Sequence, residues 1–385
     1  MRLAEIATYV NEKISSSNIT LDQYVTTDSL LQDKRGRECA QNLPPVVTNL
    51  THYQPGDVLV ANIRPYLKKI WFADYSGGAS SDVLVFRAKN LSDSSFVYAI
   101  LMQDAFYDYA MKGAKGSKMP RGDKDQIMRY EIPTFSPEQR KNIGKLITDI
   151  ESKIAVNRQI NDNLEAMAKQ LYDYWFVQFD FPNEEGKPYK SSGGKMVWKE
   201  KLKREIPAGW NVKSIFNELS VQYGYPFATD QFTEEQTNVP VVRIRDILDN
   251  SISAYSHEET DDKYRLNEGD LLVGMDGNFH MNYWIDNTAY LNQRSVRLRA
   301  TERSTVSVVQ ARYDIAPYIK AKELRAKGST VGHLSDKDLK ELYVIVGTSN
   351  KLREAFDSLL NRIIANRKEN LLLIKQRDEL LPLLM

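Results

Sequence analysis

Gly56-Asp57-Val58-Leu59 and Gly269-Asp270-Leu271-Leu272 are two copies of one short segment, and this repeat decides the fold of the 385-residue chain. The copies lie 213 residues apart. The same offset relates Glu5 to Glu218, Trp71 to Trp284, and Lys124-Asp125 to Lys337-Asp338. A chain of this length is too long for one ordinary core. We therefore expect two similarly built domains, as in a protein whose target also has two halves.

Each copy has the pattern of an α+β domain. In the first copy, the β-rich runs 57–61 and 82–86 are bounded by turn signals such as Pro55-Gly56 and Gly77-Gly78. Ser94 to Met111 has the apolar spacing of one helix.

A long helix is predicted to follow each copy. Ser136-Pro137-Glu138 provides an N-cap and a first-turn proline, and an apolar seam with steps of three and four residues extends to Trp175. A helix of about 39 residues would be about 58 Å long. The second helix begins after Thr348-Ser349-Asn350, and its seam is copied at an offset of 209.

Each seam is interrupted by two asparagines, Asn157 and Asn161 in the first helix and Asn366 and Asn370 in the second. A polar residue at a seam position fixes the register, because only a polar partner satisfies it. An antiparallel pairing brings Asn157 to Asn370 and Asn161 to Asn366, with Arg377 against Ile150 as its one mismatch. We therefore predict a long antiparallel two-helix coiled coil that separates the domains, with a pseudo-two-fold axis near the asparagines. In the alternative, each helix packs on its own domain and the asparagines face water.

The predicted boundaries follow from these patterns. They are 1–136 for the first α+β domain, 137–182 for the central helical region, 183–205 for a turn-rich connector with aromatic anchors, 206–347 for the second α+β domain, and 348–385 for the C-terminal helix.

Composition and motifs exclude several classes of protein. With 42% apolar and 27% charged residues, the chain is of the folded class, and it has neither a membrane-span pattern nor a signal peptide. We expect a cytoplasmic protein. Its single Cys39 and four dispersed histidines predict neither a disulfide framework nor a metal site. Phosphate-loop, methyltransferase and hydrolase motifs are absent, so we predict no catalytic residue and no cofactor in this chain.

Donor-rich loops follow the Gly-Asp strand in both copies. The loops are 61–71 and 274–284. The residues that flank them repeat, whereas the residues within them differ. Arg, Asn, Gln and Lys carry donors that match base edges in the major groove, so these loops suit the readout of two different sequences. Ordinary hairpin loops would have a similar composition, and this alternative stays open.

A second repeated element suits phosphate contacts. Ala114-Lys115-Gly116-Ser117-Lys118 recurs as Ala326-Lys327-Gly328-Ser329-Thr330, and a glycine beside lysine and hydroxyl groups frees backbone donors. A helix C-cap is the alternative. The candidate DNA-binding residues are Arg64, Tyr66, Lys68, Lys69, Lys115, Ser117, Lys118, Arg121, Arg243, Arg245, Asn278, His280, Asn282, Tyr283, Gln293, Arg294, Lys327, Ser329 and Thr330.

The chain resembles the specificity subunits of type I restriction-modification systems. The resemblance rests on Phe179-Asp180-Phe181-Pro182-Asn183, on Tyr189-Lys190-Ser191-Ser192-Gly193-Gly194, on Ile206-Pro207 with Gly209-Trp210, on Gly269-Asp270-Leu271-Leu272, and on the repeated Asn157-Arg158 and Asn366-Arg367. It covers nearly the whole chain. No counterpart of 206–210 precedes Leu3, and no copy of 176–183 follows the second helix.

The resemblance implies a non-catalytic subunit with two target-recognition domains, each reading one half of a split, asymmetric site on double-stranded DNA. It also implies that the helices set the spacer and dock two methyltransferase subunits, which bind S-adenosylmethionine and methylate adenine at N6. It allows two further restriction subunits, and it places the protein in a prokaryotic cytoplasm, at the nucleoid when bound to DNA. From the residues alone, a bridging protein with two similar protein-binding domains is the alternative.

Overall fold

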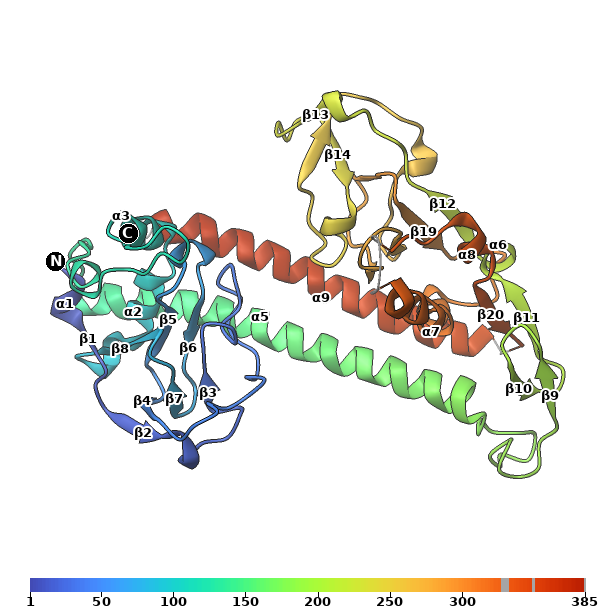
Figure 1. Cartoon of the computed structure of the whole chain (residues 1–385), viewed down its shortest axis with the longest axis horizontal. Coiled ribbons are helices and arrows are strands. Elements are labelled where there is room, and N and C mark those ends of the chain that lie inside the picture. The colour runs from blue at the N-terminus through green and yellow to red at the C-terminus, as the bar shows by residue number, and fades with distance from the viewer. Residues whose placement is uncertain (327–331, 348–349, 384–385) are drawn as a thin grey trace. The chain divides into compact units, whose positions relative to one another are not determined.

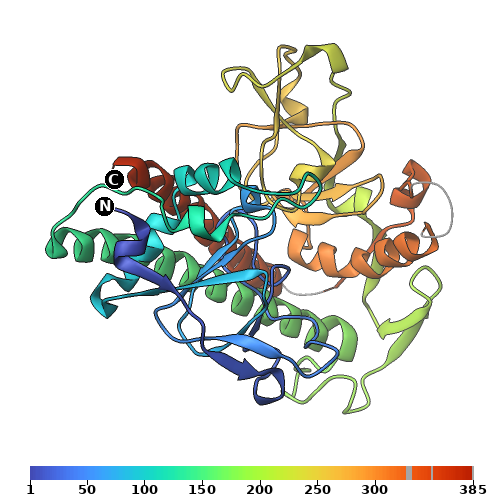
Figure 2. The same ribbon diagram turned by 60° about the vertical axis from the view of Figure 1, so that its left-hand side comes forward.

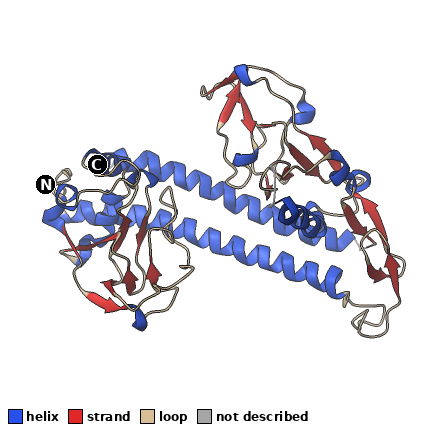
Figure 3. Cartoon of the chain, in the orientation of Figure 1, coloured by secondary structure: helices blue, strands red, loops and turns tan. Residues whose placement is uncertain are grey.

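The computed structural model describes residues 1–326, 332–347 and 350–383, which form two compact units (Figure 1). The first unit contains Met1–Ala155 and Leu371–Met385, and the second contains Val156–Asn370. Two long helices, α5 (Pro137–Tyr172) and α9 (Asn350–Leu383), give one segment to each unit. Figure 2 shows the same helices from a second direction, and Figure 3 separates helix from strand. Among the described residues, no helix is long and apolar enough to cross a bilayer.

The first unit is built on an antiparallel sheet in the order β1-β8-β5-β6. Its strands are β1 (Ala7–Tyr9), β8 (Val83–Ala88), β5 (Val58–Ala61) and β6 (Ile70–Phe72). A second sheet has the order β2 (Lys13–Ser15), β4 (Asn49–Tyr53), β7 (Gly77–Ala79) and β3 (Tyr24–Val25), with β3 parallel to β7.

The central strand β5 is buried along its whole length because both faces of the sheet are covered. Val58 and Val60 belong to the core that the helices close, and Leu59 and Ala61 belong to the core shared with the second sheet. This alternation is the period of two expected for a strand. It explains why β5 reads as a continuous apolar run.

The helix predicted from Ser94 to Met111 is two helices, α2 (Ser94–Leu101) and α3 (Asp104–Lys112). Gln103 has an extended backbone between them, and its side chain hydrogen-bonds to Leu381 O and lies 3.3 Å from the Tyr130 hydroxyl. The apolar periodicity of the sequence continues through the break, so the sequence pattern could not show that the helix is interrupted. The short helices of this unit include α1 (Leu3–Ile6) and α4 (Lys124–Ile127).

The second unit repeats the antiparallel sheet in the same order, β12-β19-β16-β17. Its strands are β12 (Ser220–Tyr223), β19 (Ser295–Arg299), β16 (Leu271–Gly274) and β17 (Met281–Tyr283). The companion sheet has the order β13 (Phe232–Thr233), β15 (Ala254–Ser256), β14 (Val239–Val242) and β18 (Tyr290–Leu291). Here β14 is the parallel partner of β18.

The repeated Gly-Asp pair makes the same turn in both units. Gly56 and Gly269 have φ of +88° and +86°, a region that favours glycine. The aspartate that follows is buried and forms a two-pronged ion pair with an arginine of the neighbouring strand. Asp57 pairs with Arg87 at 2.8 Å through both prongs, and Asp270 pairs with Arg299 at 2.6 and 2.7 Å. The aspartate also accepts the backbone N–H three residues earlier.

The remaining elements of the second unit surround its sheet. They are α6 (Ile215–Glu218), α7 (Val308–Ala326), α8 (Asp336–Lys340), the strand pair β11 (Asn211–Ser214) and β20 (Tyr343–Val346), and the hairpin β9 (Met196–Lys199) and β10 (Arg204–Pro207). Helix α5 ends at Tyr172 and continues as a π-helical turn, Asp173–Gln178, close to the predicted end at Trp175. Phe181 stacks between Trp175 and Trp210, with ring centres 4.9 and 5.0 Å away, and so anchors the connector.

Segments of α5 and α9 pair within each unit. In the second unit, Asn157 donates to Asn370 Oδ1 at 3.0 Å and Asn366 donates to Asn161 Oδ1 at 2.9 Å, which are the two pairs that the seam pattern predicts. These contacts make the two segments antiparallel. In the first unit, Arg377 is buried in the seam but reaches Glu151 at 2.6 Å, so the predicted mismatch has a partner of opposite charge.

Replacing Asp270 with alanine is expected to lower the free energy of unfolding by about 3 kcal/mol, because Arg299 would lose its charge partner and the turn its cap. Chemical denaturation followed by circular dichroism measures the change. The exposed Asp230, changed to alanine as a control, should stay within about 0.5 kcal/mol. Equal effects of the two substitutions would contradict this role for the ion pair.

Candidate nucleic-acid interface

The two candidate segments of the first unit meet at the end of β5. Arg64 has φ of +53° and donates its backbone N–H to Pro120 O at 2.7 Å. Lys115 and Arg121 exchange backbone hydrogen bonds at 2.9 and 3.0 Å, which closes the basic segment into a loop. The side chains of Arg64, Tyr66, Lys115, Ser117, Lys118 and Arg121 are all exposed. The structure therefore brings the predicted base-reading loop and the predicted phosphate loop together.

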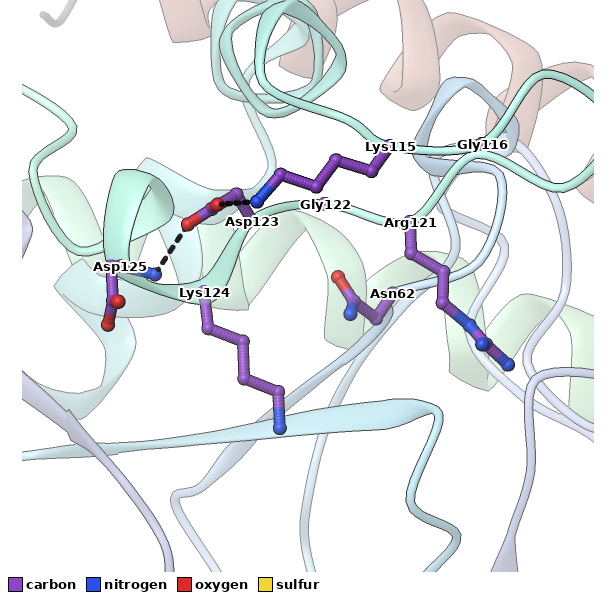
Figure 4. Close-up of a pocket in the computed structure, with 8 residues that line it drawn as sticks. All are labelled: Asn62, Lys115, Gly116, Arg121, Gly122, Asp123, Lys124 and Asp125. Carbon is purple, nitrogen blue, oxygen red and sulfur yellow. Dashed lines mark hydrogen bonds and ion pairs between the residues drawn. The ribbon is translucent and has the colours of Figure 1, made fainter.

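The shared hollow at this place holds about 590 Å³ (Figure 4). Two of its cations are paired with neighbouring acids: Lys115 lies 3.0 Å from Asp123, and Arg121 lies 3.1 Å from Asp82. The pKa of the Asp123 carboxyl is lowered, first by the Gln126 backbone N–H and then by Lys115. The lysine and arginine are thus oriented before any ligand arrives.

Gly116 has φ of +96° in this loop, and helix α3 ends earlier, at Lys112. In the first copy, the repeated Ala-Lys-Gly element is therefore a loop and not the C-cap of that helix.

Asn62 is a lining residue that the sequence analysis missed. It follows β5 directly, and in Figure 4 its side chain is seen between those of Lys124 and Arg121. Only 8% of the residue is exposed, and Asn62 Oδ1 has no hydrogen-bond partner among the described residues. Its counterpart at the 213 offset is Met275, so the change from an apolar to an amide side chain was the signal available in the sequence.

Lys68 and Lys69 both have partners within the first unit. Lys68 forms an ion pair with Asp104 at 2.9 Å. Lys69 donates its ammonium group to Thr27 O at 2.5 Å, and burial lowers its pKa. The predicted contact of Lys69 with DNA is therefore corrected, because its ammonium group binds Thr27 O within the first unit. The ion pair of Lys68 is of the same kind as those of Lys115 and Arg121, so its contact with DNA stays a prediction.

The second unit has its own hollow, of about 440 Å³, next to the end of β16. Its lining residues are Arg243, Ile244, Arg245, Asn278, His280, Asn292, Gln293 and Arg294. All six of the predicted residues 243, 245, 278, 280, 293 and 294 are among them, although they come from three separate segments. Arg245, Asn278, Gln293 and Arg294 are exposed, so their donors can meet a ligand.

Two arginines that line this hollow have hydrogen-bond or ion-pair partners within the second unit. Arg243 donates to Ser253 O and Oγ at 2.8 and 2.7 Å, and burial, followed by the charge of Arg245, lowers its pKa. Arg294 lies 3.0 Å from Asp276. Arg243 therefore forms part of the wall, and Arg245 is the more available cation.

Asn282 and Tyr283 lie in the core, and their predicted role in binding DNA is wrong. Asn282 is 8% exposed and Tyr283 is 2% exposed. The Asn282 amide is fully used within the second unit, and the Tyr283 ring packs under Arg312 at 5.0 Å. The predicted loop, 274–284, extends too far along the chain, because β17 already begins at Met281. Lys327, Ser329 and Thr330 fall outside the described residues.

Both hollows offer amide and cationic donors at the surface. Arginine and lysine pair with guanine, asparagine and glutamine pair with adenine, and lysine also contacts phosphate. Among the described residues, no group of three or more histidine, cysteine or acidic side chains is arranged to hold a metal ion. The chemistry of these hollows is that of recognition by hydrogen bonds.

Comparison with known proteins gives the family. Residues 207–371 match the family described as the type I restriction modification DNA specificity domain. The specificity subunit of the type I restriction enzyme MjaIX from Methanocaldococcus jannaschii is 24% identical over 306 residues, which are 76% of this chain and 68% of that protein. Residues 207–371 thus match the type I DNA specificity domain, and the chain is similar over most of its length to a type I specificity subunit. It is accordingly a DNA-specificity subunit and not an enzyme in its own right.

One further related sequence and one solved structure show how much of the chain resembles known proteins. The EcoBI specificity subunit of Escherichia coli is 28% identical over 162 residues, and the match spans about a third of that relative, 34%, and 41% of this chain. The crystal structure of the type I S subunit from M. genitalium aligns over all of this chain and 95% of that chain, with a TM-score of 0.58 and 14% identity. The specificity subunit thus shares its fold with a solved member of the family.

Replacing Arg64 with alanine should relax base preference at one position of the recognised site, at a cost of about 1–3 kcal/mol for the preferred sequence. Replacing Lys115 should instead weaken binding to all sequences and reduce the salt slope by about one. Competition mobility shifts at several salt concentrations measure both effects. If Lys115→Ala altered base preference more than Arg64→Ala did, these assignments would be reversed.

Proposed function

We propose that each recognition domain reads one half of a bipartite, asymmetric site on double-stranded DNA. We take residues 1–136 and 206–347 as the two domains. The observation that carries the proposal is the pair of hollows: the sheet and the Asp–Arg turn are the same in both units, while the lining side chains differ. One frame with two sets of donors suits the reading of two different half-sites.

The helices are proposed to act as the ruler between the half-sites. The asparagine pairs fix one register of α5 against α9 in the second unit, and Arg377 with Glu151 adds a polar contact in the first. A pair of helices with a fixed register can set a constant spacer. On this proposal, the two segments belong to one antiparallel coiled coil with a pseudo-two-fold axis near the asparagines.

The same helices are proposed to dock two methyltransferase subunits. Helix α5 carries apolar side chains that stay exposed beside the buried seam. Val156 is 50%, Ile160 41% and Met167 54% exposed, and all three lie on one flank at helical spacing. Such a stripe on a helix fits an apolar surface of a partner. The partner would bring S-adenosylmethionine and methylate adenine at N6, and restriction subunits would join this complex.

Exchanging residues 1–136 with those of a relative of different specificity should change one half-site and leave the other half-site and the spacer unchanged. The chimera is expressed with its methyltransferase, and methylated adenines are mapped across a genome. A change in both half-sites would contradict the division of labour. If neither the wild-type chain nor its complex shifted duplex DNA in a salt-dependent way, the alternative of a protein-bridging role would be favoured.

The double substitution Ile160→Glu and Met167→Glu should abolish co-purification with the methyltransferase, because it places two charges in an apolar contact. Circular dichroism should remain that of the wild-type chain, since both side chains are exposed. The exposed Ala166, changed to glutamate on a different face of the same helix, is the matched control. Normal assembly of the double variant would place the docking surface elsewhere.

A further inference from the structure

Arg367 of helix α9 reaches into the second recognition domain instead of facing outward. Its guanidinium donates to Glu165 Oε1 on α5 at 2.9 Å and to Asn282 Oδ1 on β17 at 2.8 Å. The arginine side chain is 22% exposed, and Asn282 is 8% exposed. One side chain therefore joins both long helices to the sheet of the second unit.

Asn282 connects Arg367 to a turn of the second unit. Its Nδ2 donates to Ile247 O at 3.1 Å and to Leu248 O at 2.8 Å, and its Oδ1 also accepts the Tyr283 backbone N–H at 2.9 Å. Because an amide has one acceptor end and one donor end, the arginine on Oδ1 fixes which end faces the two carbonyl groups. The orientation of Asn282 thus depends on Arg367.

The turn that Asn282 holds is a wall of the second hollow. Ile247 and Leu248 directly follow η6 (Ile244–Asp246), and Arg243, Ile244 and Arg245 line the hollow. Asp246 is 1% exposed and accepts the Arg243 backbone N–H at 2.9 Å, so the turn is internally braced. A shift at Ile247 and Leu248 would therefore carry Arg245 with it.

The corresponding contact in the first unit is built differently. Lys69 lies at the position of Asn282, since Trp71 and Trp284 are equivalent, and it holds the turn at Thr27 directly. No contact between Lys69 and the long helices is described for that unit. The first hollow thus provides an internal control within the same molecule.

We propose that Arg367 is a positioning residue for base readout by the second domain, acting through Asn282 on the turn that carries Arg245. This inference rests on the proposed function, because it assigns to a helix residue an effect on one half-site only. It goes beyond the docking and spacing roles of the helices. Three hydrogen bonds connect the Arg367 guanidinium through Asn282 to this turn.

The test uses the full specificity subunit in complex with its methyltransferase. Arg367→Ala removes the donor, and Asn282→Asp keeps the acceptor for Arg367 but places a carboxylate against two carbonyl oxygens. The matched control is Arg362→Ala, an exposed arginine on the same helix. Methylation of DNA libraries varied in one half-site at a time gives the discrimination between right and wrong bases for each half.

Both variants are expected to lose discrimination in the second half-site by about tenfold, a loss within the range of one mismatched pair. Discrimination in the first half-site, complex assembly and the control variant should be unchanged. Adding Arg367→Ala to Asn282→Asp should cause little further loss, because both act through one contact. Arg367→Lys, which keeps one donor, should restore part of the discrimination.

Two results would overturn the inference. Unchanged discrimination in the second half-site would show that the turn does not depend on Arg367, and equal losses in both half-sites would show general destabilisation. If Arg367→Ala does not assemble, Arg367→Lys decides by the same criteria. A wild-type complex that methylates no bipartite motif would instead refute the proposed function, so the two failures are distinguishable.

Discussion

The fold of both units depends on a buried aspartate that neutralises an arginine at the start of the central strand. Asp57 with Arg87, and Asp270 with Arg299, join neighbouring strands through two hydrogen bonds each. A carboxylate buried this deeply would be costly without its partner, and the fork of the guanidinium restricts the angle between the strands. The left-handed glycine before each aspartate then follows, because the turn must bring the carboxylate inward.

The loops beyond this frame differ between the two units, and they leave the sheet where its central strand ends. Asn62 lines the first hollow, whereas its counterpart Met275 lies in the core of the second unit. The neighbouring cations come from 115–121 in the first hollow and from 243–245 and 293–294 in the second. Recognition needs donors that are already oriented, and in both hollows nearby carboxylates hold an arginine or lysine in place. The shared frame thus supports two different sets of donors.

The helices combine two kinds of polar contact that coiled-coil reasoning treats separately. The asparagine pairs satisfy each other inside the seam and fix its register. Arg377 and Arg367 instead use seam or flanking positions to reach carboxylates, and Arg367 continues to the amide of Asn282. A polar residue on such a helix can therefore serve the neighbouring domain as well as the helix pair.

The sequence by itself determined the duplication, the start and approximate end of both long helices, and the asparagine pairs, because each of these depends on spacing along the chain. The sequence also predicted six of the residues that line the second hollow. Only the tertiary structure decided which polar side chains are available. Lys69 donates a hydrogen bond to Thr27, and Asn282 donates to Ile247 and Leu248. These partners are 34 to 42 residues away along the chain. Gln103, in the break between α2 and α3, likewise donates to Leu381 O, 278 residues away. A local pattern records periodicity and residue type, but burial and hydrogen-bond partners are set by segments that meet only when the chain has folded.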